Sequence, residues 1–410
     1  MSTDAQVVVV GGGPVGLMSA LGLAKAGVSV TVIEAEAGII DSPRALAYAW
    51  PILDGLDLAG VLDDMADAGS YSFGVAFNVL ATGETIFYDH SCLVGHVERP
   101  VSLLLGQNRL AGVILRHLER YPNVEILWST RVTALDQDDD SVTVTATRED
   151  GSELRLSADW VIGADGGRST VRKSLGLELE GITWPERFVA TNIRCDFSRA
   201  GYRSGYVIDP QHGAVLFQIT EDGLWRFTFS EDASLPKETI EERIEPALRT
   251  LLPDSANYEL TLWSGYSMHQ RSAPRYRVGR VLLAGDSAHV TNPTSGFGLM
   301  GGLYDVFLLT ETLAAVIDGS QSPDILDRYA SARRDVFLNF TSPASVESMR
   351  LVFHSDDPVR LEQDLQTLRD RKKDRAAMRA FLSAPRALET PSLISGLTLR
   401  QRLEQSRAGA

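Results

Sequence analysis

Cysteine is scarce in this 410-residue chain, which contains only Cys92 and Cys195. Two thiols in a chain of this length do not make the disulfide framework of a small secreted domain, and they fit a reducing compartment. A metal site is not indicated either, because His90, Cys92 and His96 lie close together without a convincing fourth ligand. We therefore expect a cytoplasmic protein that holds no metal.

Long hydrophobic runs and an excess of basic residues are also missing. No segment reaches roughly 18 uninterrupted apolar residues, the length needed to cross a bilayer. The opening residues, MSTDAQ, lack the basic and apolar stretches typical of a secretory signal. Lysine and arginine number 39 against 54 aspartates and glutamates, which gives a formal charge of −15. This balance argues against nucleic acid or an anionic membrane surface as a partner.

A run of valines that leads directly into glycines is the most informative feature present, VVVVGGGPVG at residues 7–16. The pattern predicts a buried strand, a tight turn, a helix and a second strand. Gly11 would permit the turn, Gly13 would let a pyrophosphate approach the backbone, and Gly16 would let the helix pack on the strand. Glu34 follows Gly13 by about 20 residues, where a carboxylate accepts hydrogen bonds from ribose hydroxyls. The unit predicts a dinucleotide site without separating FAD from NAD.

Two later segments extend the pattern. GADGGRSTVR occupies residues 163–172, and GRVLLAGDSAHVTNPTSGFGLMGGLYD occupies residues 279–305. With the first motif, they resemble the ordered motifs of the FAD-dependent aromatic hydroxylases, the single-component flavoprotein monooxygenases similar to p-hydroxybenzoate hydroxylase. The resemblance covers residues 5–345.

The resemblance implies a mixed fold, α/β plus α+β. A Rossmann-like FAD-binding domain would be interleaved with a β-sheet substrate domain and followed by C-terminal helices. We place the FAD-binding domain at residues 1–70, 101–180 and 272–345, the substrate-binding domain at residues 71–100 and 181–271, and the C-terminal helical region at residues 346–410.

For the cofactor, the resemblance implies contacts along the whole length of FAD. Asp286 would hold the ribityl chain, and N–H groups near Gly298 would face the pyrimidine oxygen of the flavin ring. Met300 stands where many relatives carry asparagine, which puts a side-chain contact in doubt there. The predicted cofactor-binding residues are Gly11, Gly13, Pro14, Val15, Gly16, Glu34, Ala35, Arg44, Gln107, Asp165, Gly166, Asp286, Pro293, Gly296, Gly298, Leu299 and Met300.

Some polar residues of these motifs keep two interpretations. Arg168 and Arg172 are either partners for the negative charge of FAD or NAD(P)H, or solvated surface arginines. His289 either holds the loop beside the cofactor or packs in the core.

For catalysis we expect Pro293, Tyr206, His212 and Tyr266 to meet the substrate. The carbonyl group of Pro293 is a candidate by resemblance, and a histidine or tyrosine could act as the base that ionises a phenol. His212 could equally lie in a hairpin turn, and the two tyrosines could be core or edge aromatics.

The activity implied is that of an NAD(P)H-dependent flavoprotein monooxygenase. It would use NADH or NADPH and O2 to hydroxylate a phenolic or related aromatic substrate through a flavin C4a-hydroperoxide. The partners would be those small molecules, in a monomer or homodimer that binds neither nucleic acid nor membrane. The alternative is a related FAD-dependent epoxidase, reductase or halogenase that acts on a non-phenolic substrate.

Overall fold

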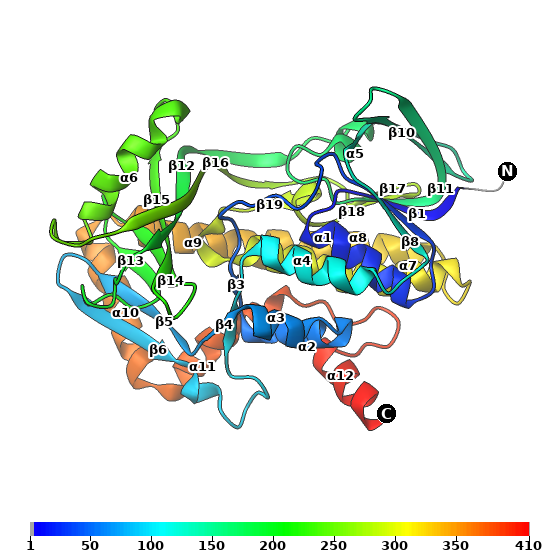
Figure 1. The fold of residues 1–410 in the computed structure, drawn as a ribbon. Helices are drawn as coiled ribbons and strands as arrows, with labels where there is room; N and C mark the ends of the chain where they lie inside the picture. Colours follow the sequence, from blue (N-terminus) through cyan, green and yellow to red (C-terminus); the bar gives the residue numbers. More distant parts are fainter. Residues whose placement is uncertain (1–3, 410) are drawn as a thin grey trace.

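Two β-sheets, with helices packed around them, make up the molecule (Figure 1). The computed structural model describes residues 4–409. The predictions that involve residues 1–3 and 410 therefore lie partly outside the described residues.

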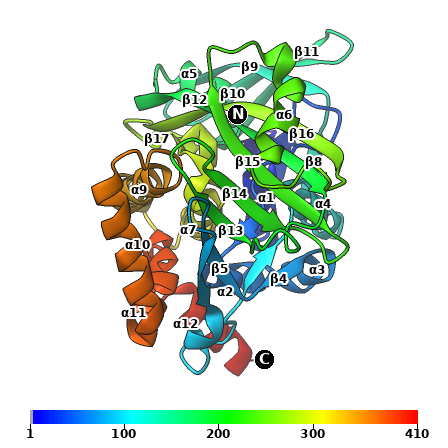
Figure 2. The ribbon, with the colours of Figure 1, turned by 90° about the vertical axis from the view of Figure 1, so that its left-hand side faces the viewer.

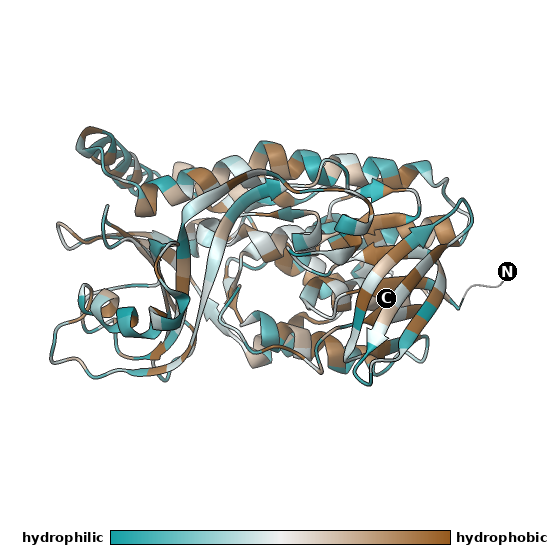
Figure 3. Ribbon diagram, turned by 90° about the horizontal axis from the view of Figure 1, so that it is seen from above, coloured by the Kyte–Doolittle hydropathy of each residue, from teal (hydrophilic) through white to brown (hydrophobic). Residues whose placement is uncertain are grey.

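The first sheet carries the glycine-rich turn at the end of its central strand. Its strands are β1 (Ala5–Val10), β2 (Val30–Ile33), β8 (Val124–Leu127), β9 (Thr130–Gln137), β10 (Val142–Arg148), β11 (Glu153–Gly163), β17 (Arg277–Val278) and β18 (Val281–Leu283). They lie in the order β17–β18–β11–β1–β2–β8, with β10 and β9 attached to β11. Val7, Val8 and Val9 are fully buried, so both faces of β1 are covered. In Figure 3 the strands beside the N-terminus are accordingly largely brown.

Helices α1 (Pro14–Lys25), α4 (Gln107–Leu118) and α7 (Phe297–Ile317) belong to this part of the fold, and α1 packs against both of the others. The helix α1 ends just before Gly27, whose φ of 79° is left-handed, as the sequence predicts. By length and composition alone, α7 could cross a membrane, although the hydrophobic pattern of the sequence predicts no membrane-spanning segment. However, 67% of its most apolar window is buried inside the fold, which is typical of a core helix.

The second sheet is antiparallel for most of its width. Its strands are β5 (Gly74–Val79), β6 (Glu84–Asp89), β12 (Glu180–Arg194), β13 (Gly205–Ile208), β14 (Ala214–Gln218), β15 (Leu224–Asp232), β16 (Glu259–Ser272) and β19 (His289–Val290). Their order is β19–β16–β12–β15–β14–β13–β5–β6. In Figure 1, the long strands β12 and β16 extend from this sheet towards the first one.

Short elements stand between the longer strands of the chain. They are the strands β3 (Ala47–Tyr48), β4 (Ser70–Ser72) and β7 (Ser102–Leu104), which form a small third sheet, and the helices α2 (Trp50–Ala59), α3 (Leu62–Ala68), α5 (Thr170–Ser174) and α6 (Ile240–Arg249). The sequence pattern over residues 45–62 predicts a helical stretch. Instead, Ala47 and Tyr48 pair with Leu104 and Leu103 before α2 begins, because the distant strand β7 supplies their hydrogen-bond partners.

The C-terminal helices are α8 (Asp324–Val336), the π-helical turn η5 (Phe337–Thr341), α9 (Ser342–Phe353), α10 (Pro358–Lys373), α11 (Arg375–Ser383) and α12 (Leu399–Ala408). Of these, α9, α10 and α11 lie along one edge of the second sheet (Figure 2), whereas α8 packs against α7 and α12 against α2. The alternating charges after Ser355 predict a solvated helix or, as the alternative, a contact between subunits. In the structure, α10 buries Leu365 and Leu368 in a cluster that also holds Phe77 and Tyr88 of the second sheet.

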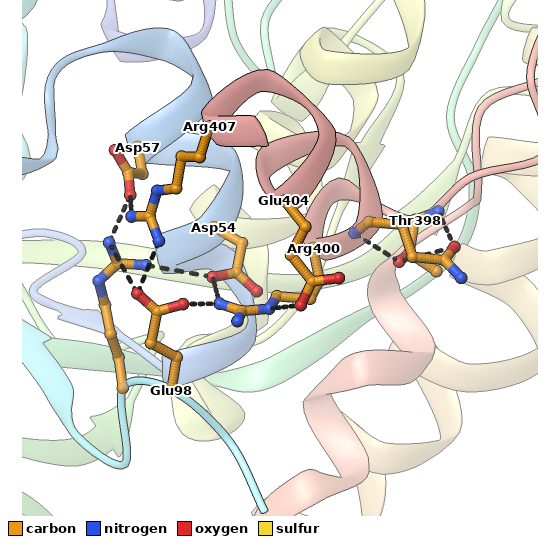
Figure 4. Close-up of polar contacts among 9 residues, drawn as sticks. Asp54, Asp57, Glu98, Thr398, Arg400, Glu404 and Arg407 are labelled. Atoms are coloured by element: carbon orange, nitrogen blue, oxygen red, sulfur yellow. Dashed lines mark hydrogen bonds and ion pairs between the residues drawn. The ribbon is translucent and has the colours of Figure 1, made fainter. Parts of the chain in front are cut away.

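A network of ion pairs holds α12 against α2 and the segment before β7 (Figure 4). Arg407 contacts Asp57 at 2.8 Å and Glu98 at 2.9 Å. Arg400 pairs with Glu98 as well, and it lies 3.8 Å from Asp54. Glu98 therefore bridges two arginines of the same helix.

The architecture confirms the predicted fold class: an α/β part built on a parallel sheet, a second sheet interleaved with it, and C-terminal helices. The boundaries of the three predicted domains stay a prediction.

Candidate active site

A cavity of about 1480 Å³ is lined by residues of both sheets. Its walls include the glycine-rich turn after β1, the ends of β2 and β11, the start of α7, one face of the second sheet, and parts of α9, α10 and α11. A space of this size is large enough for more than one small molecule, since typical ligand pockets measure roughly 300–1,000 Å³.

The three glycines of the first motif have different surroundings. A Cβ on Gly16 would lie 1.9 Å from the carbonyl oxygen of Gly11, and one on Gly11 would lie 2.4 Å from that of Ala164. At Gly13, in contrast, a Cβ would meet no protein atom within 4 Å. Gly11 and Gly16 are thus required by the fold itself. Gly13 leaves bare backbone at the N-terminus of α1, where a pyrophosphate fits.

Glu34 lies where the sequence places it, at the end of β2 and on the cavity wall. Its Oε2 accepts a hydrogen bond from the N–H of Gly12 at 2.5 Å, and its Oε1 accepts one from Glu36 at 2.8 Å. These bonds fix the carboxylate, and each oxygen keeps a lone pair for a ribose hydroxyl. Ala35 lines the cavity next to it.

Asp165 belongs to the second motif and faces the same cavity. Its Oδ2 accepts hydrogen bonds from the N–H groups of Thr170 at 2.6 Å and Val171 at 3.1 Å. Its Oδ1 is buried and has no partner among residues 4–409, and burial raises the pKa of this carboxyl group. An unpartnered buried oxygen fits a hydrogen bond from a bound cofactor.

The two arginines of this motif differ. Arg172 is 2% exposed, and it donates to the carbonyl groups of Ser287 and Gly167 at 2.9 Å each. It therefore ties the second motif to the third, and the interpretation as a solvated surface arginine is wrong for it. Arg168 is exposed and lines the cavity, so both interpretations stay open for that side chain.

Asp286 lies deep in the molecule, yet its carboxylate is exposed to the cavity. Burial raises the pKa of Asp286, although His289, Arg44 and His269 oppose that shift. Arg44 and Gln107, the first residue of α4, line the cavity too. This set can hold the hydroxyl groups and phosphates of a flexible chain.

The start of α7 forms the far end of this wall. Asn292 accepts a hydrogen bond from Thr294, and Gly296 takes a left-handed φ of 70° before the helix begins. Residues 298–300 line the cavity, and the unpaired N–H groups of a 21-residue helix concentrate positive potential there. Such an end favours a ligand that carries or develops negative charge, as the pyrimidine ring of a reduced flavin does.

Beneath this helix start lies a buried charged cluster that sequence reasoning missed. Asp305 of α7 contacts His289 and Arg333 at 2.7 Å each and also accepts the N–H of Gly285 at 2.9 Å. Burial opposes ionisation of Asp305, but His289 and Arg333 outweigh it and hold the pKa of that carboxyl group below its ordinary value. His289 thus packs in the core and also supports the loop that carries Asp286.

One face of the second sheet is the opposite wall. Its register places Tyr206, Val215 and Thr228 side by side on β13, β14 and β15. Phe217 is likewise opposite Arg226, and Phe188 of β12 is opposite Tyr266 of β16. Each of these side chains lines the cavity.

Arg226 is a polar residue of this wall that the sequence motifs did not predict. It is 6% exposed, donates through Nε to Asn192 at 2.9 Å, and also donates to the carbonyl group of Arg44. Burial lowers its pKa to about 10, so it stays charged at neutral pH. An arginine within an ordinary strand pattern gives no local signal of this position.

The predicted catalytic residues are only partly brought together. Pro293, Tyr206 and Tyr266 line the cavity. His212 lies in the turn between β13 and β14, where Asp209 accepts its N–H at 2.8 Å, and it is not part of the cavity wall. Gly16 is also absent from the wall, because its place is the contact between α1 and the Gly11 turn.

Comparisons with known proteins agree with this geometry. The family model described as "FAD binding domain" matches residues 4–342. 6-Hydroxy-3-succinoylpyridine 3-monooxygenase HspB of Pseudomonas putida (strain DSM 28022 / S16) is 44% identical over 95% of this chain and 100% of its own. Para-nitrophenol 4-monooxygenase of Pseudomonas sp. (strain WBC-3) is 45% identical over 93% of this chain and 95% of its own.

A solved structure shares the whole fold. The crystal structure of p-nitrophenol 4-monooxygenase PnpA from Pseudomonas putida DLL-E4 superposes with a TM-score of 0.90, at 42% identity over 95% of this chain and 99% of the other. The motifs, the cavity that they line, and these relatives agree. The chain therefore belongs to the FAD-dependent aromatic hydroxylases, flavoprotein monooxygenases that use NAD(P)H and O2.

Proposed function

We propose that this enzyme oxygenates an aromatic ring at a substituted carbon that lies para to a ring hydroxyl group. The observation that carries the proposal is the similarity, over nearly the whole chain, to two relatives whose names specify this position. Position 4 of para-nitrophenol carries the nitro group and lies para to the hydroxyl group. Position 3 of 6-hydroxy-3-succinoylpyridine carries the succinoyl group and lies para to the hydroxyl at position 6. Oxygenation there displaces the substituent.

When bound, FAD supplies hydride acceptance from NAD(P)H and the activation of O2. In our proposal, Glu34, Gly13 and Asp286 bind its adenosine, pyrophosphate and ribityl parts. The N–H groups at the start of α7 orient the flavin ring and stabilise negative charge on it. Pro293 contributes its carbonyl group beside the ring.

The second sheet would hold the substrate. Phe188, Val215 and Phe217 give an apolar wall that excludes water from the reacting ring, and polar groups are placed between them. Burial raises the pKa values of Tyr206 and Tyr266 to about 12 each. Both hydroxyl groups are thus protonated at neutral pH, so we assign them as hydrogen-bond donors to the substrate and not as bases. His212 has no place in this site.

The experiment is a comparison of nitrophenol isomers with the FAD-loaded enzyme. We expect para-nitrophenol to support NAD(P)H oxidation with release of nitrite and a quinone product, at one nitrite for each NAD(P)H consumed. The meta isomer, which lacks a substituent para to its hydroxyl group, should release none. Formation of a nitrocatechol without nitrite would contradict the proposed position.

The predictions about oligomeric state, location in the cell and macromolecular partners belong to the same proposal. We propose a monomer or homodimer that works in the cytoplasm without nucleic acid or membrane. Light scattering together with cell fractionation would test this, and a stable higher oligomer or a membrane-bound fraction would contradict it.

A further inference from the structure

The cavity wall extends from the cofactor region past Tyr206 to side chains that the proposed function above does not use. This part of the wall begins at the turn before α7. There Thr294 donates to the sulfur of Met349 at 3.5 Å, and Ser295 donates to Ser348 at 3.0 Å. Met349 belongs to an apolar cluster against which Tyr206 packs. The turn beside the flavin end is thus connected through α9 to the Tyr206 side of the sheet.

From Tyr206, aromatic rings continue outward. Phe77 of β5 stacks on Tyr206 with ring centroids 5.6 Å apart, and Phe381 of α11 lies 6.2 Å from Phe77. The Arg371 guanidinium of α10 lies 4.6 Å from the centre of the Phe381 ring. All four side chains line the cavity, so they form one continuous wall, here called the aromatic arm.

Arg371, the charged residue of the aromatic arm, has no acidic partner. Two other arginines of this region are paired: Arg350 with Glu347 and Asp364, and Arg369 with Glu84 and Glu362. Among residues 4–409, no carboxylate lies within 4.0 Å of Arg371, although it is half-buried on the cavity wall. A guanidinium held on an aromatic ring and open to a cavity is suited to bind a carboxylate through two parallel hydrogen bonds.

We propose that the aromatic arm is a subsite for the substituent para to the ring hydroxyl, and that Arg371 selects substituents that end in a carboxylate. The inference rests on the proposed function, because it needs a para-substituted ring as the substrate. It names the substrate class more narrowly: phenols or hydroxypyridines with an acidic side chain several bonds long. A nitro group carries no such side chain and would leave Arg371 without a carboxylate partner.

The test is equilibrium binding to the FAD-loaded enzyme, without NAD(P)H, so that no turnover is needed. The probes are a para-succinoyl phenol, its methyl ester and para-nitrophenol. Arg371→Gln should weaken binding of the free acid about tenfold, the loss expected for a charge-assisted hydrogen bond. It should change the Kd values of the ester and of para-nitrophenol less than twofold. Arg371→Lys should restore part of the affinity for the acid.

Lys372→Gln is the matched control, because Lys372 is the neighbouring residue on α10, carries the same charge, is exposed and does not line the cavity. This variant should bind all three probes as the wild type does. Equal loss for acid and ester in Arg371→Gln, equal loss in Lys372→Gln, or a wild-type enzyme that does not prefer the acid to its ester would overturn the subsite. If the binding pattern holds but oxygen enters at an unsubstituted carbon, the proposed function fails and the subsite stands.

Discussion

At the scale of single residues, the atoms around each residue show whether the fold or the ligand requires that residue. Gly16 and Gly13 stand three residues apart in one motif. Yet one is packed against backbone, and the other faces open space. A motif read from sequence gives both glycines equal weight, whereas the packing around them predicts opposite consequences of substitution.

Gly16→Ala should prevent folding, because its Cβ would lie 1.9 Å from the Gly11 oxygen, a backbone atom that has no room to move. Gly13→Ala should fold normally, since no protein atom lies within 4 Å of its Cβ, but should bind FAD at least about tenfold more weakly. Soluble yield and thermal unfolding of the FAD-free protein, followed by flavin titration, check both. Normal FAD affinity in Gly13→Ala would show that no phosphate lies at this turn.

Tyr266 gives a second prediction at this scale. Because burial raises the pKa of Tyr266 to about 12, its hydroxyl group stays protonated and can donate one hydrogen bond to the substrate. Tyr266→Phe removes that hydrogen bond and should lower kcat/KM by roughly five- to tenfold. The shape of the pH profile between about pH 6 and pH 9 should not change, because the group does not titrate there. Loss of an ionisation from that range in the variant would mean that Tyr266 acts as a base.

At the scale of elements, the start of α7 is held from below by α8. The helix presents its N-terminus to the cavity while Asp305, about two turns further along, binds His289 and Arg333. The π-helical turn after α8 adds two aromatic contacts: Phe337 stacks on His289 at 5.0 Å, and Phe340 stacks on Phe297 at 5.6 Å. The orientation of the cofactor's ring would then depend on residues that never touch it.

Asp305→Asn should destabilise the fold by about 3–5 kcal/mol, because it leaves the guanidinium of Arg333 buried without its counter-charge. The low pKa of Asp305 adds a pH dependence. The stability it contributes is present above the unfolded value of roughly 3.9 and is lost as the pH falls further. Urea unfolding of both proteins measures the difference. Glu153→Gln, which removes an exposed pair with Arg155, is the control and should cost less than about 1 kcal/mol. An equally small effect of Asp305→Asn would exclude a structural role for the cluster.

Local patterns predicted the elements that are built locally. The strand, turn, helix and strand around Gly13 follow from a valine run, glycines and a helix-period pattern within residues 5–34. Local patterns did not predict β3, because Ala47 and Tyr48 form a strand only when β7, more than fifty residues away, supplies their pairing partner. The positions of Arg226 and Arg371 on the cavity wall were not predicted for the same reason. Strands and helices distant in the sequence form that cavity, and the residues next to each arginine do not indicate it.

At the scale of the whole molecule, the C-terminal segment packs against elements from the N-terminal part of the chain. Phe381, Leu382, Ala384 and Pro385 of this segment line the cavity, and Trp50 of α2 donates to the carbonyl group of Leu382 at 2.9 Å. Beyond them, α12 returns to α2 through the ion pair of Arg407 with Asp57, and Glu98 adds pairs with Arg400 and Arg407 (Figure 4). Electrostatics at the surface therefore help to hold one wall of the active site.

Glu98→Gln should lower Tm at neutral pH by about 1–2 °C and make it less sensitive to salt. Hydrogen bonds from Arg407 and Arg400 lower the pKa of Glu98 to about 2. Since this lies below the unfolded value of roughly 4.3, the stabilisation exists above that pH and disappears between about 4.3 and 2. The gap in Tm between variant and wild type should thus narrow as the pH falls through this range.

Glu404→Gln provides the comparison, because within the described part of the chain Glu404 is ion-paired with Arg400 alone, on the exposed side of α12. Its effect on Tm should be smaller than that of Glu98→Gln at every pH. Identical effects of the two changes would show that bridging both arginines gives no additional stability.

The interleaving of the two sheets has a consequence for biosynthesis. Strand β11 lies between β1, near the start of the chain, and β18, which ends at Leu283. A ribosome that releases the chain from its N-terminus therefore cannot offer β11 both neighbours until more than half of the protein has emerged. During that interval, Val161 and Ile162 form an apolar, unpaired edge, the kind of surface on which nascent chains aggregate and chaperones act.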